Sequence, residues 1–319
     1  LVGCDGGSSA VRRQLGIKYA GEALATQPYG TGATISTHLR APALYDRLLK
    51  RKCWQHWIVN GATRSLLTTL DGEGEFLFNT RCASVDDPPD PDFITRVFLA
   101  TVGQDVTFEF VGHWPWTAGH ALVADSFGQG RALLAGDAVH LFTPTGGFGM
   151  NTGIEDSANL AWKLAARVQG WGGPHLIESY AAERRPIAFR NTGHSKRLAR
   201  NVGEVPSAEA MGRDTPEGAA ARRQAGDFLS TFGEEFASLG VQLGARYDES
   251  PIVAQDAAPT PPDDPAVYMP SGKPGGRAPH VWLADRISLY DRMGKAFTLL
   301  RLPGGRADAI GRPSKETTA

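Results

Sequence analysis

Two stretches of this 319-residue sequence place an aspartate beside unusually bare backbone. The first holds Asp5 and Gly6, just after a short apolar run. The second holds Gly136 and Asp137 after another apolar run, and a glycine-rich loop at 144–149 follows it. An aspartate at the carboxyl end of a buried strand suits ribose hydroxyls, and glycines let a planar or phosphorylated ligand reach main-chain N–H groups. The order of strand, aspartate, glycines and helix predicts a dinucleotide site.

A long helix is expected directly after the glycine-rich loop. We predict that it begins at Asn151 or Thr152 and continues to about residue 169. Its free N–H groups and positive dipole end favour a pyrophosphate or an electron-rich ring. The i, i+4, i+7 spacing predicts that a stripe of apolar residues forms its packed face. The stripe consists of Ile154, Ala158, Ala161, Ala165 and Val168.

The elements that must position these motifs follow from periodicity and turn signals. The chain opens with a strand, a tight turn and a helix capped by Ser8 or Ser9. Short β-type runs separated by Gly, Asp and Pro turns are predicted at 29–37, 53–60, 64–70, 75–80 and 106–114, with helices near 42–51 and 90–101. A second long helix should start near Pro174 and be kinked or divided by Pro186, and an amphipathic segment covers 215–239.

These elements predict a mixed α/β (α+β) fold in five parts. Residues 1–27 and 126–254 are two pieces of one nucleotide-binding domain, and 28–125 form an antiparallel sheet inserted between them. Residues 255–280, with seven prolines, are expected to be an extended arm, and 281–319 to begin a further domain with two short strands. Because the chain opens on a strand-like Leu-Val and closes on a polar tail, we expect a fragment truncated at both ends.

Composition narrows the function classes. With 41% hydrophobic and 21% charged residues and no apolar run of roughly 18 residues, a membrane span is not expected. A net charge of −1 with scattered basic residues argues against nucleic-acid binding. Three dispersed cysteines without a C-x-x-C pair argue against a metal site or a disulfide framework and indicate a reducing cytoplasm. Cys4, beside Asp5, is expected to be a small buried hydrophobic residue.

Both motifs resemble those of one enzyme family. The stretch "GDAVHLFTPTGGFGMNTGIEDSANLAWKLA" is similar to the second flavin-binding signature of the class A flavoprotein aromatic hydroxylases, and "GCDGGSSAVRRQLG" is similar to their Asp-Gly motif. The resemblance covers roughly residues 1–190. The proline-rich arm and "HVWLADRISLYDRMGKAFTLL" resemble the start of the thioredoxin-like C-terminal domain in the phenol and dichlorophenol hydroxylase branch. The resemblance implies a Rossmann-like FAD-binding domain that lacks its N-terminal βαβ unit here.

The resemblance also implies roles for individual residues. Asp137, in the Gly136-Asp137 pair, would bind the FAD ribose, and Pro144 would flank the side of the flavin that reacts with oxygen. Asp5, Gly6 and Arg12 would lie near the FAD pyrophosphate and the path used by NADPH or NADH. The residues expected to line the isoalloxazine are Gly146, Gly147, Gly149, Met150 and Asn151.

The implied chemistry is hydroxylation of a phenolic or related aromatic ring. In this family NAD(P)H reduces FAD, O2 adds to give a C4a-hydroperoxide, and one oxygen is transferred to the substrate. The protein must exclude water and hold the ring near that oxygen. Candidates to line the pocket are Trp54, Trp57, Phe108, Trp114, Trp116 and Phe142, with His56 or His113 as partner of a phenolic hydroxyl. Core packing is the alternative for each aromatic, and His140 is interpreted as structural.

Three alternatives stay open at this point. A flavin-dependent halogenase shares the fold, but its W-x-W-x-I-P signature is replaced here by "WQHWIVN". An epoxidase or a reductase of the same fold is a second alternative. The family's opening G-x-G-x-x-G is not in this sequence, so a non-catalytic fragment or pseudoenzyme is the third, and FAD binding by the fragment is open. The expected partners are a small aromatic substrate and O2, and a homodimer is one alternative for the assembly.

Overall fold

The computed structural model describes residues 1–23, 32–49, 51–60, 63–284, 286–294 and 296–300. The chain divides into two units. The first comprises Leu1–Met269 with Lys273–Arg277, and the second comprises Pro270–Gly272 with Ala278–Ala319. The predicted motifs and the predicted inserted sheet all fall within the first unit.

A five-stranded antiparallel sheet forms most of the segment between the two motifs. Its order is β4-β5-β6-β3-β7, and every neighbouring pair is antiparallel. Its strands are β3 (Gly32–Arg40), β4 (Gln55–Val59), β5 (Arg64–Thr69), β6 (Glu75–Arg81) and β7 (Glu109–Ala118). The predicted strands and both predicted short helices, α2 (Ala43–Arg47) and α3 (Pro91–Val102), are confirmed; residues 29–31 of the first predicted run lie outside the described residues.

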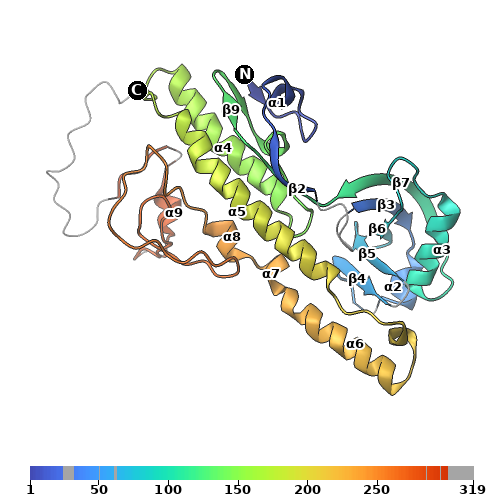
Figure 1. Ribbon diagram of the computed structural model, residues 1–319. Helices are drawn as coiled ribbons and strands as arrows, with labels where there is room; N and C mark the ends of the chain where they lie inside the picture. Colours follow the sequence, from blue (N-terminus) through green and yellow to red (C-terminus); the bar gives the residue numbers. More distant parts are fainter. Residues whose placement is uncertain (24–31, 50, 61–62, 285, 295, 301–319) are drawn as a thin grey trace. The chain divides into compact units, whose positions relative to one another are not determined.

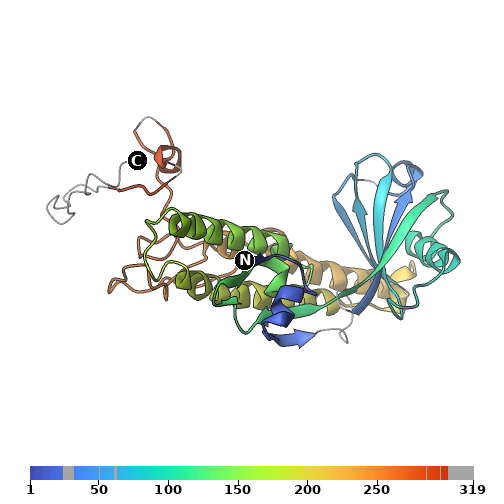
Figure 2. The same cartoon turned by 90° about the horizontal axis from the view of Figure 1, so that it is seen from above.

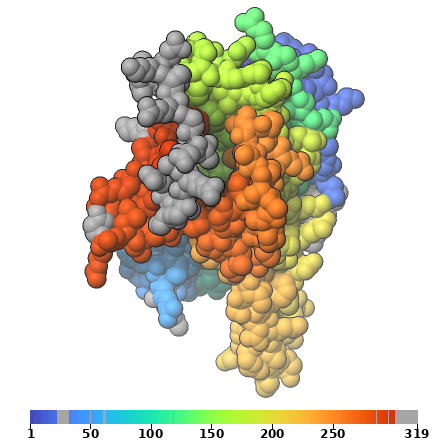
Figure 3. Space-filling view, turned by 90° about the vertical axis from the view of Figure 1, so that its left-hand side faces the viewer, coloured from blue at the N-terminus to red at the C-terminus, as the bar shows by residue number. Residues whose placement is uncertain are grey.

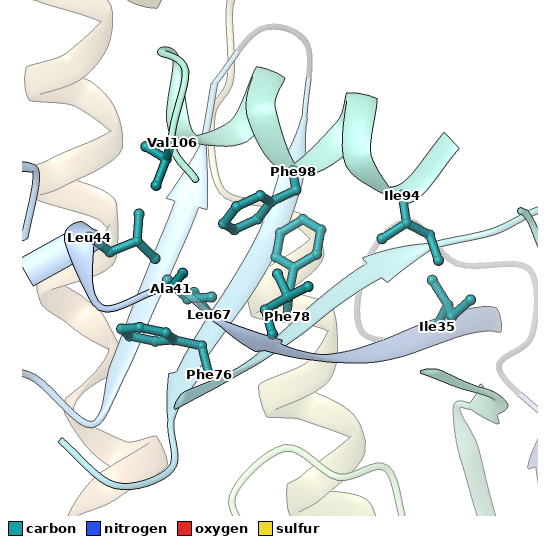
Figure 4. Packing of buried hydrophobic residues seen from close by; sticks show 10 residues of the cluster. Ile35, Ala41, Leu44, Leu67, Phe76, Phe78, Ile94, Phe98 and Val106 are labelled. Carbon is teal, nitrogen blue, oxygen red and sulfur yellow. The ribbon is translucent and has the colours of Figure 1, made fainter. Parts of the chain in front are cut away.

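The two faces of this sheet have different surroundings. Because side chains alternate along a strand, one face carries Ile35, Phe76 and Phe78 and packs under α3, whose Ile94 and Phe98 point down onto it (Figure 4). These side chains are at most about 1% exposed. Asp90 caps the helix by accepting from the Phe93 N–H, and Gly103 ends it in the left-handed conformation. One face is therefore filled by the protein, which leaves the opposite face for other contacts.

Two small sheets join the chain's first residues to the segment around the second motif. In the first, β1 (Val2–Gly3) lies parallel to β10 (Ala132–Leu134), which pairs with β9 (Gly128–Gln129). In the second, β8 (His120–Ala124) lies between β2 (Tyr19–Ala23) and β11 (His140–Leu141). Ser9 caps α1 (Ala10–Gln14), as predicted. The two motifs, far apart in sequence, are thus held side by side.

Helices α4 (Phe148–Val168) and α5 (Glu178–Gly203) run side by side along this region (Figures 1 and 2). The predicted packed stripe of α4 is wrong. Ile154 and Val168 are 58% and 86% exposed, whereas the buried face carries Asp156, Leu160 and Lys163. Charged residues occupy the interior because α5 supplies their counter-charges. Of the two outcomes predicted for Pro186, division of the helix is wrong, since α5 continues through it as one helix, and a kink stays a prediction.

After α5 the chain forms shorter helices and then the arm. The segment predicted at 215–239 consists of α6 (Pro216–Leu229), a 3-10 turn and α7 (Gly233–Phe236), and α8 (Leu239–Leu243) follows. Figure 3 shows α6 projecting from its neighbours in the first unit. Residues 255–280 contain neither helix nor strand, in agreement with an extended arm. Among the described helices, none combines the length and apolarity needed to cross a bilayer.

The second unit differs from the prediction in its described part. In place of two strands it has a single bridge between Trp282 and Ser288 and the four-residue helix α9 (Leu289–Arg292). Residues 301–319, the last 19 of the 39 predicted for the start of a thioredoxin-like domain, lie outside the described residues. The mixed α/β fold with its inserted antiparallel sheet is confirmed, while the five domain boundaries remain predictions.

Candidate active site

The Gly-Asp turn directly follows β10. Gly136 has a φ of 63°, which only glycine adopts easily, and it begins a 3-10 turn through Ala138. Asp137 is exposed, and its backbone carbonyl accepts from the Tyr19 hydroxyl at 2.5 Å. Burial raises the pKa of Tyr19 to about 12, so this hydroxyl stays a donor. A β-carbon on Gly153 would lie 3.2 Å from the Gly136 Cα. The turn is therefore held firmly while the Asp137 carboxylate faces solvent.

The glycine-rich loop becomes helix earlier than predicted. Gly146 and Gly147 have φ values of 84° and 68°, and α4 begins at Phe148 rather than at Asn151 or Thr152. Gly149, Met150 and Asn151 therefore lie in the first turn of the helix, where 73% of Met150 is exposed. No side chain caps this end and no acidic residue lies in its first turn. The exposed N–H groups and the helix dipole remain available to an electron-rich group.

The first motif uses its carboxylate to cap a helix. Asp5 accepts from the Ser9 hydroxyl at 2.5 Å and from the N–H groups of Ala10 and Val11 at 2.7 and 3.1 Å. The Ser9 bond, with help from these N–H groups, lowers the pKa of Asp5. Gly6 has a φ of 79° and open space around it. Cys4 is exposed, so its predicted burial is wrong: it follows the end of β1, where no element covers it.

Arg12 connects the two motifs. Its guanidinium is buried, lies 3.8 Å from the Tyr19 ring centre, and donates to the carbonyls of Gly7 and Ala138 at 3.0 and 3.1 Å. These contacts hold the first turn against the second. Arg12 was predicted to lie near a pyrophosphate, and the structure gives it a role in positioning the backbone of that site.

A buried ionic network, centred on Asp156, holds the backbone of the Gly-Asp turn. Except for His140, its residues were not among those predicted from the sequence. Asp156 is fully buried and accepts from the Gly136 N–H (3.2 Å), His140 Nε2 (2.6 Å) and Arg184 Nε (2.8 Å). The interpretation of His140 as structural agrees with this position. The helical spacing of Asp156 and Lys163, seven residues apart, was the available signal, because it places two charges on one face of the helix.

A second buried pair lies further along the same two helices. Lys163 Nζ of α4 lies 2.5 Å from Glu183 Oε2 of α5. The Glu183 carboxylate also accepts hydrogen bonds from the Asn159 side-chain amide and the Ser250 hydroxyl, each at 2.6 Å. Desolvation lowers the pKa of Lys163, against the opposing effect of Glu183. The buried charges are thus paired and hydrogen-bonded, as they must be when removed from water.

A cavity of about 320 Å³ lies against the open face of the five-stranded sheet. Within it, the Trp116 Nε1 donates to the Ser36 hydroxyl at 2.7 Å, and that hydroxyl bonds to Asn79 at 2.5 Å. The buried Gln55 Oε1 has no partner among the described residues. The sheet contributes Thr34, Ser36, Gln55, Trp57, Leu66, Thr68, Leu77, Asn79, Thr80, Arg81 and Trp116, and the remaining wall consists of Pro144, Thr145, Val202 and Glu235. Nine of these fifteen lining residues are polar or charged, and the rest are apolar, so the hollow can both bury a small molecule and hydrogen-bond to it.

The structure brings together only some of the predicted pocket residues. Trp57, Trp116 and Pro144 line the cavity. His56 is corrected: strand alternation turns it to the opposite face of β4, where burial lowers its pKa. The others predicted also lie outside the cavity lining. Trp54 and Trp114 are 64% and 55% exposed, Phe108 packs on the α3 core, His113 contacts Phe110, and Phe142 packs with Phe148.

Comparison with known proteins assigns the family. A family described as "FAD binding domain" matches residues 1–195, which is more than half of the chain. The chain belongs to this FAD-binding family. It is 32% identical over 336 residues to the FAD-dependent monooxygenase opdD of Penicillium oxalicum, covering 98% of this chain and 61% of the relative. It is 33% identical over 350 residues to 4-methyl-5-nitrocatechol 5-monooxygenase of a Burkholderia species, covering 99% and 56%.

A solved structure of the same family has a similar fold. The rebeccamycin biosynthetic enzyme RebC with reduced flavin superimposes with a TM-score of 0.77 at 34% identity, over 92% of this chain and 53% of RebC. The chain therefore spans between about half and three fifths of the length of these relatives.

The second motif fits the family's cofactor. Asp137 presents an exposed carboxylate just after β10, and no side chain of the described residues caps the start of α4. A β-carbon at Gly147 would meet nothing within 4 Å, so the loop leaves room for a flat group to approach the backbone. These features match the hydroxyl, pyrimidine and carbonyl groups of a flavin nucleotide.

Proposed function

We propose that this chain is part of an FAD-dependent monooxygenase that consumes NADPH or NADH and hydroxylates a phenolic or related aromatic substrate. One observation carries the proposal: a single cavity has an aromatic-bearing sheet as one wall and Pro144 and Thr145 of the glycine-rich loop as the other. That loop contains the second flavin motif. A ring bound in the cavity would therefore be close to the part of the chain that faces the flavin.

Each group of residues has a separate task in this proposal. The Asp137 carboxylate binds ribose hydroxyls, and the free first-turn N–H groups of Gly149 and Met150, with Asn151 next to them, hold the electron-rich edge of the flavin ring. FAD, when bound, supplies oxygen activation. Trp57 and Trp116 bind the substrate ring and exclude water from it. The remaining motif residues, Gly6, Gly136 and Gly146, let the backbone approach the cofactor closely.

The relatives support an aromatic substrate. The Burkholderia relative is named for action on a substituted catechol, which is a phenolic ring. The cavity volume of about 320 Å³ is within the range of small-ligand pockets, which starts at roughly 300 Å³. A one- or two-ring phenol is the substrate class that we expect. A homodimer and a cytoplasmic location are further parts of the proposal, to be checked by light scattering and by fractionation.

The experiment that tests this function compares wild type with Asp137→Ala. The wild type should carry a yellow flavin spectrum and oxidise NAD(P)H faster when a phenol is added, with peroxide release recorded to measure uncoupling. The variant should lose about tenfold or more in FAD affinity, which corresponds to about 1.4 kcal/mol, while its circular dichroism is unchanged. Asp125→Ala, on the loop after β8, is the matched control. Unchanged flavin occupancy in Asp137→Ala would contradict the assignment of this carboxylate.

A further inference from the structure

Glu235 is the acidic side chain among the described residues that line the cavity. Glu235 belongs to the short helix α7 and lines the cavity beside Pro144 and Thr145. The Gly146 backbone lies close enough to this carboxylate to lower its pKa. Glu235 is therefore next to the glycine-rich loop and lines the same cavity as Trp57 and Trp116.

Two arginines lie near Glu235: Arg197 forms a salt bridge with another acid, and Arg81 is exposed to solvent. Arg197 of α5 lines the adjoining hollow, but it pairs with Glu234 at 2.6 Å and contacts His194 at 2.9 Å. Desolvation, followed by the charge of Arg197, lowers the pKa of His194. Arg81, at the end of β6, is exposed at the cavity rim. Burial raises the pKa of Glu235 to about 7, against the lowering effect of the Gly146 backbone.

We propose that Glu235 binds the hydroxyl group of the phenolic substrate and accepts its proton during hydroxylation. In this step the phenolic O–H bond breaks, its electron pair stays on the substrate oxygen, and a new O–H bond forms on the Glu235 carboxylate. No electrons are exchanged. The inference rests on the proposed function, and it assigns to Glu235 the role that the sequence analysis gave to a histidine.

Physical chemistry favours this residue for the task. A base works best when its pKa is near the working pH, because it is then available yet still able to hold a proton. A phenolate is more electron-rich than a phenol, so deprotonation prepares the ring for attack by an electrophilic oxygen. Gln55 supplies a second hydrogen-bonding group in the cavity. Its buried Oε1 has no partner among the described residues and can accept a hydrogen bond from a second hydroxyl of the substrate. Glu235 thereby orients the ring as well as deprotonating it.

The test uses the flavin-loaded protein and the variants Glu235→Gln and Glu234→Gln. Glu234 is the matched control, because it is the adjacent acid but pairs with Arg197 outside the cavity lining. We expect Glu235→Gln to lower kcat/KM for phenols by about 100-fold or more, the usual contribution of a general base, with flavin content retained. In wild type kcat/KM should rise with pH through about 7, and this limb should vanish in Glu235→Gln only.

A binding measurement separates this inference from the proposed function. The probe is 4-nitrophenol, whose phenolate is yellow, bound to protein that is not supplied with NAD(P)H. We expect the bound probe to ionise in wild type and in Glu234→Gln and to stay neutral in Glu235→Gln. Wild type that ionises the probe but shows no phenol-dependent NAD(P)H oxidation would refute the monooxygenase and, with it, a role in hydroxylation, and would retain only Glu235 as the group that binds and deprotonates a phenol. Equal ionisation or equal kcat/KM in wild type and Glu235→Gln, or no probe binding, would overturn the inference.

Discussion

Two buried polar regions of the molecule differ in how completely their hydrogen bonds are made. Beneath the Gly-Asp turn, Asp156 is fully buried and accepts from three donors. In the cavity against the sheet, the buried Gln55 Oε1 has no partner among the described residues, and Glu235 lies beside the Gly146 backbone. The Asp156 carboxylate is fully used as an acceptor, which makes a rigid support, although Nδ1 of His140 in the same network has no partner among the described residues. An acceptor without a partner in the cavity leaves capacity for a ligand. The difference separates the residues that hold the site from those that act in it.

The largest effect is expected from removing Asp156, which joins Gly136, His140 and Arg184. Asp156→Ala leaves Arg184 buried without its full counter-charge and should lower the free energy of unfolding by about 3–5 kcal/mol. Glu155→Ala is the matched control, because Glu155 bonds to the same arginine at 2.9 Å but is 46% exposed. It should cost less than about 1 kcal/mol. Urea unfolding of both variants measures the difference, and equal losses would show that the Asp156 network is not the support described.

A smaller effect is expected from the pH dependence of stability. Since the Glu235 pKa is about 7 in the folded protein against an ordinary 4.5, the folded state holds the proton more tightly than the unfolded chain. Its contribution is therefore complete below about pH 4.5 and is lost as the pH rises through about 7, by on the order of 2 kcal/mol once solvent screening of this partly exposed carboxylate reduces the full value of about 3 kcal/mol. Glu235→Gln should flatten this part of the stability curve, measured by urea unfolding between pH 4 and about 8. A curve that keeps its slope in the variant would mean that another group causes it.

The smallest effect is expected from removing the unpaired oxygen of Gln55. Gln55→Met should change the free energy of unfolding by less than about 1 kcal/mol, in the stabilising direction, because a buried acceptor without a partner is unfavourable. It should also weaken binding of a catechol, whose second hydroxyl can donate to Gln55, and leave binding of 4-nitrophenol, which has one hydroxyl, unchanged. Ser36→Ala is the contrasting variant, since it leaves the Trp116 N–H without its acceptor and should cost about 1 kcal/mol or more. Thermal unfolding of both variants would test this, and a loss of stability in Gln55→Met would show that its oxygen is paired.

Local chemistry made much of the fold predictable. Asp-Gly and Gly-Asp pairs after apolar runs, a serine before a helix, and alternating residues between turns all act over a few residues. The two motifs, the strands and the cap of the first helix could therefore be placed. Pro144, Trp57 and Trp116 could be chosen for the same reason. Their position next to a flavin motif or on an aromatic strand was visible in the sequence.

The interior face of α4 could not be predicted in this way. Asp156 and Lys163 have the composition of a solvated face, and their partners Arg184 and Glu183 come 20–28 residues later on another helix. His56 and Trp57 adjoin each other on one strand, and only the sheet's packing decides which of them faces the cavity. Glu235, in a four-residue helix, has no periodic signal at all. What escaped prediction depends on contacts between distant segments.

The Asp156 carboxylate connects the Gly-Asp turn to helix α5. One of its oxygens holds the Gly136 amide of the cofactor turn, and the other holds Arg184 in the middle of α5. Occupancy of the turn and docking of α5 on α4 are consequently linked equilibria. Saturating the protein with FAD should slow amide hydrogen exchange along α4 and α5, including at amides that the cofactor does not contact. The melting temperature of the protein thus becomes a readout of how tightly this turn is held.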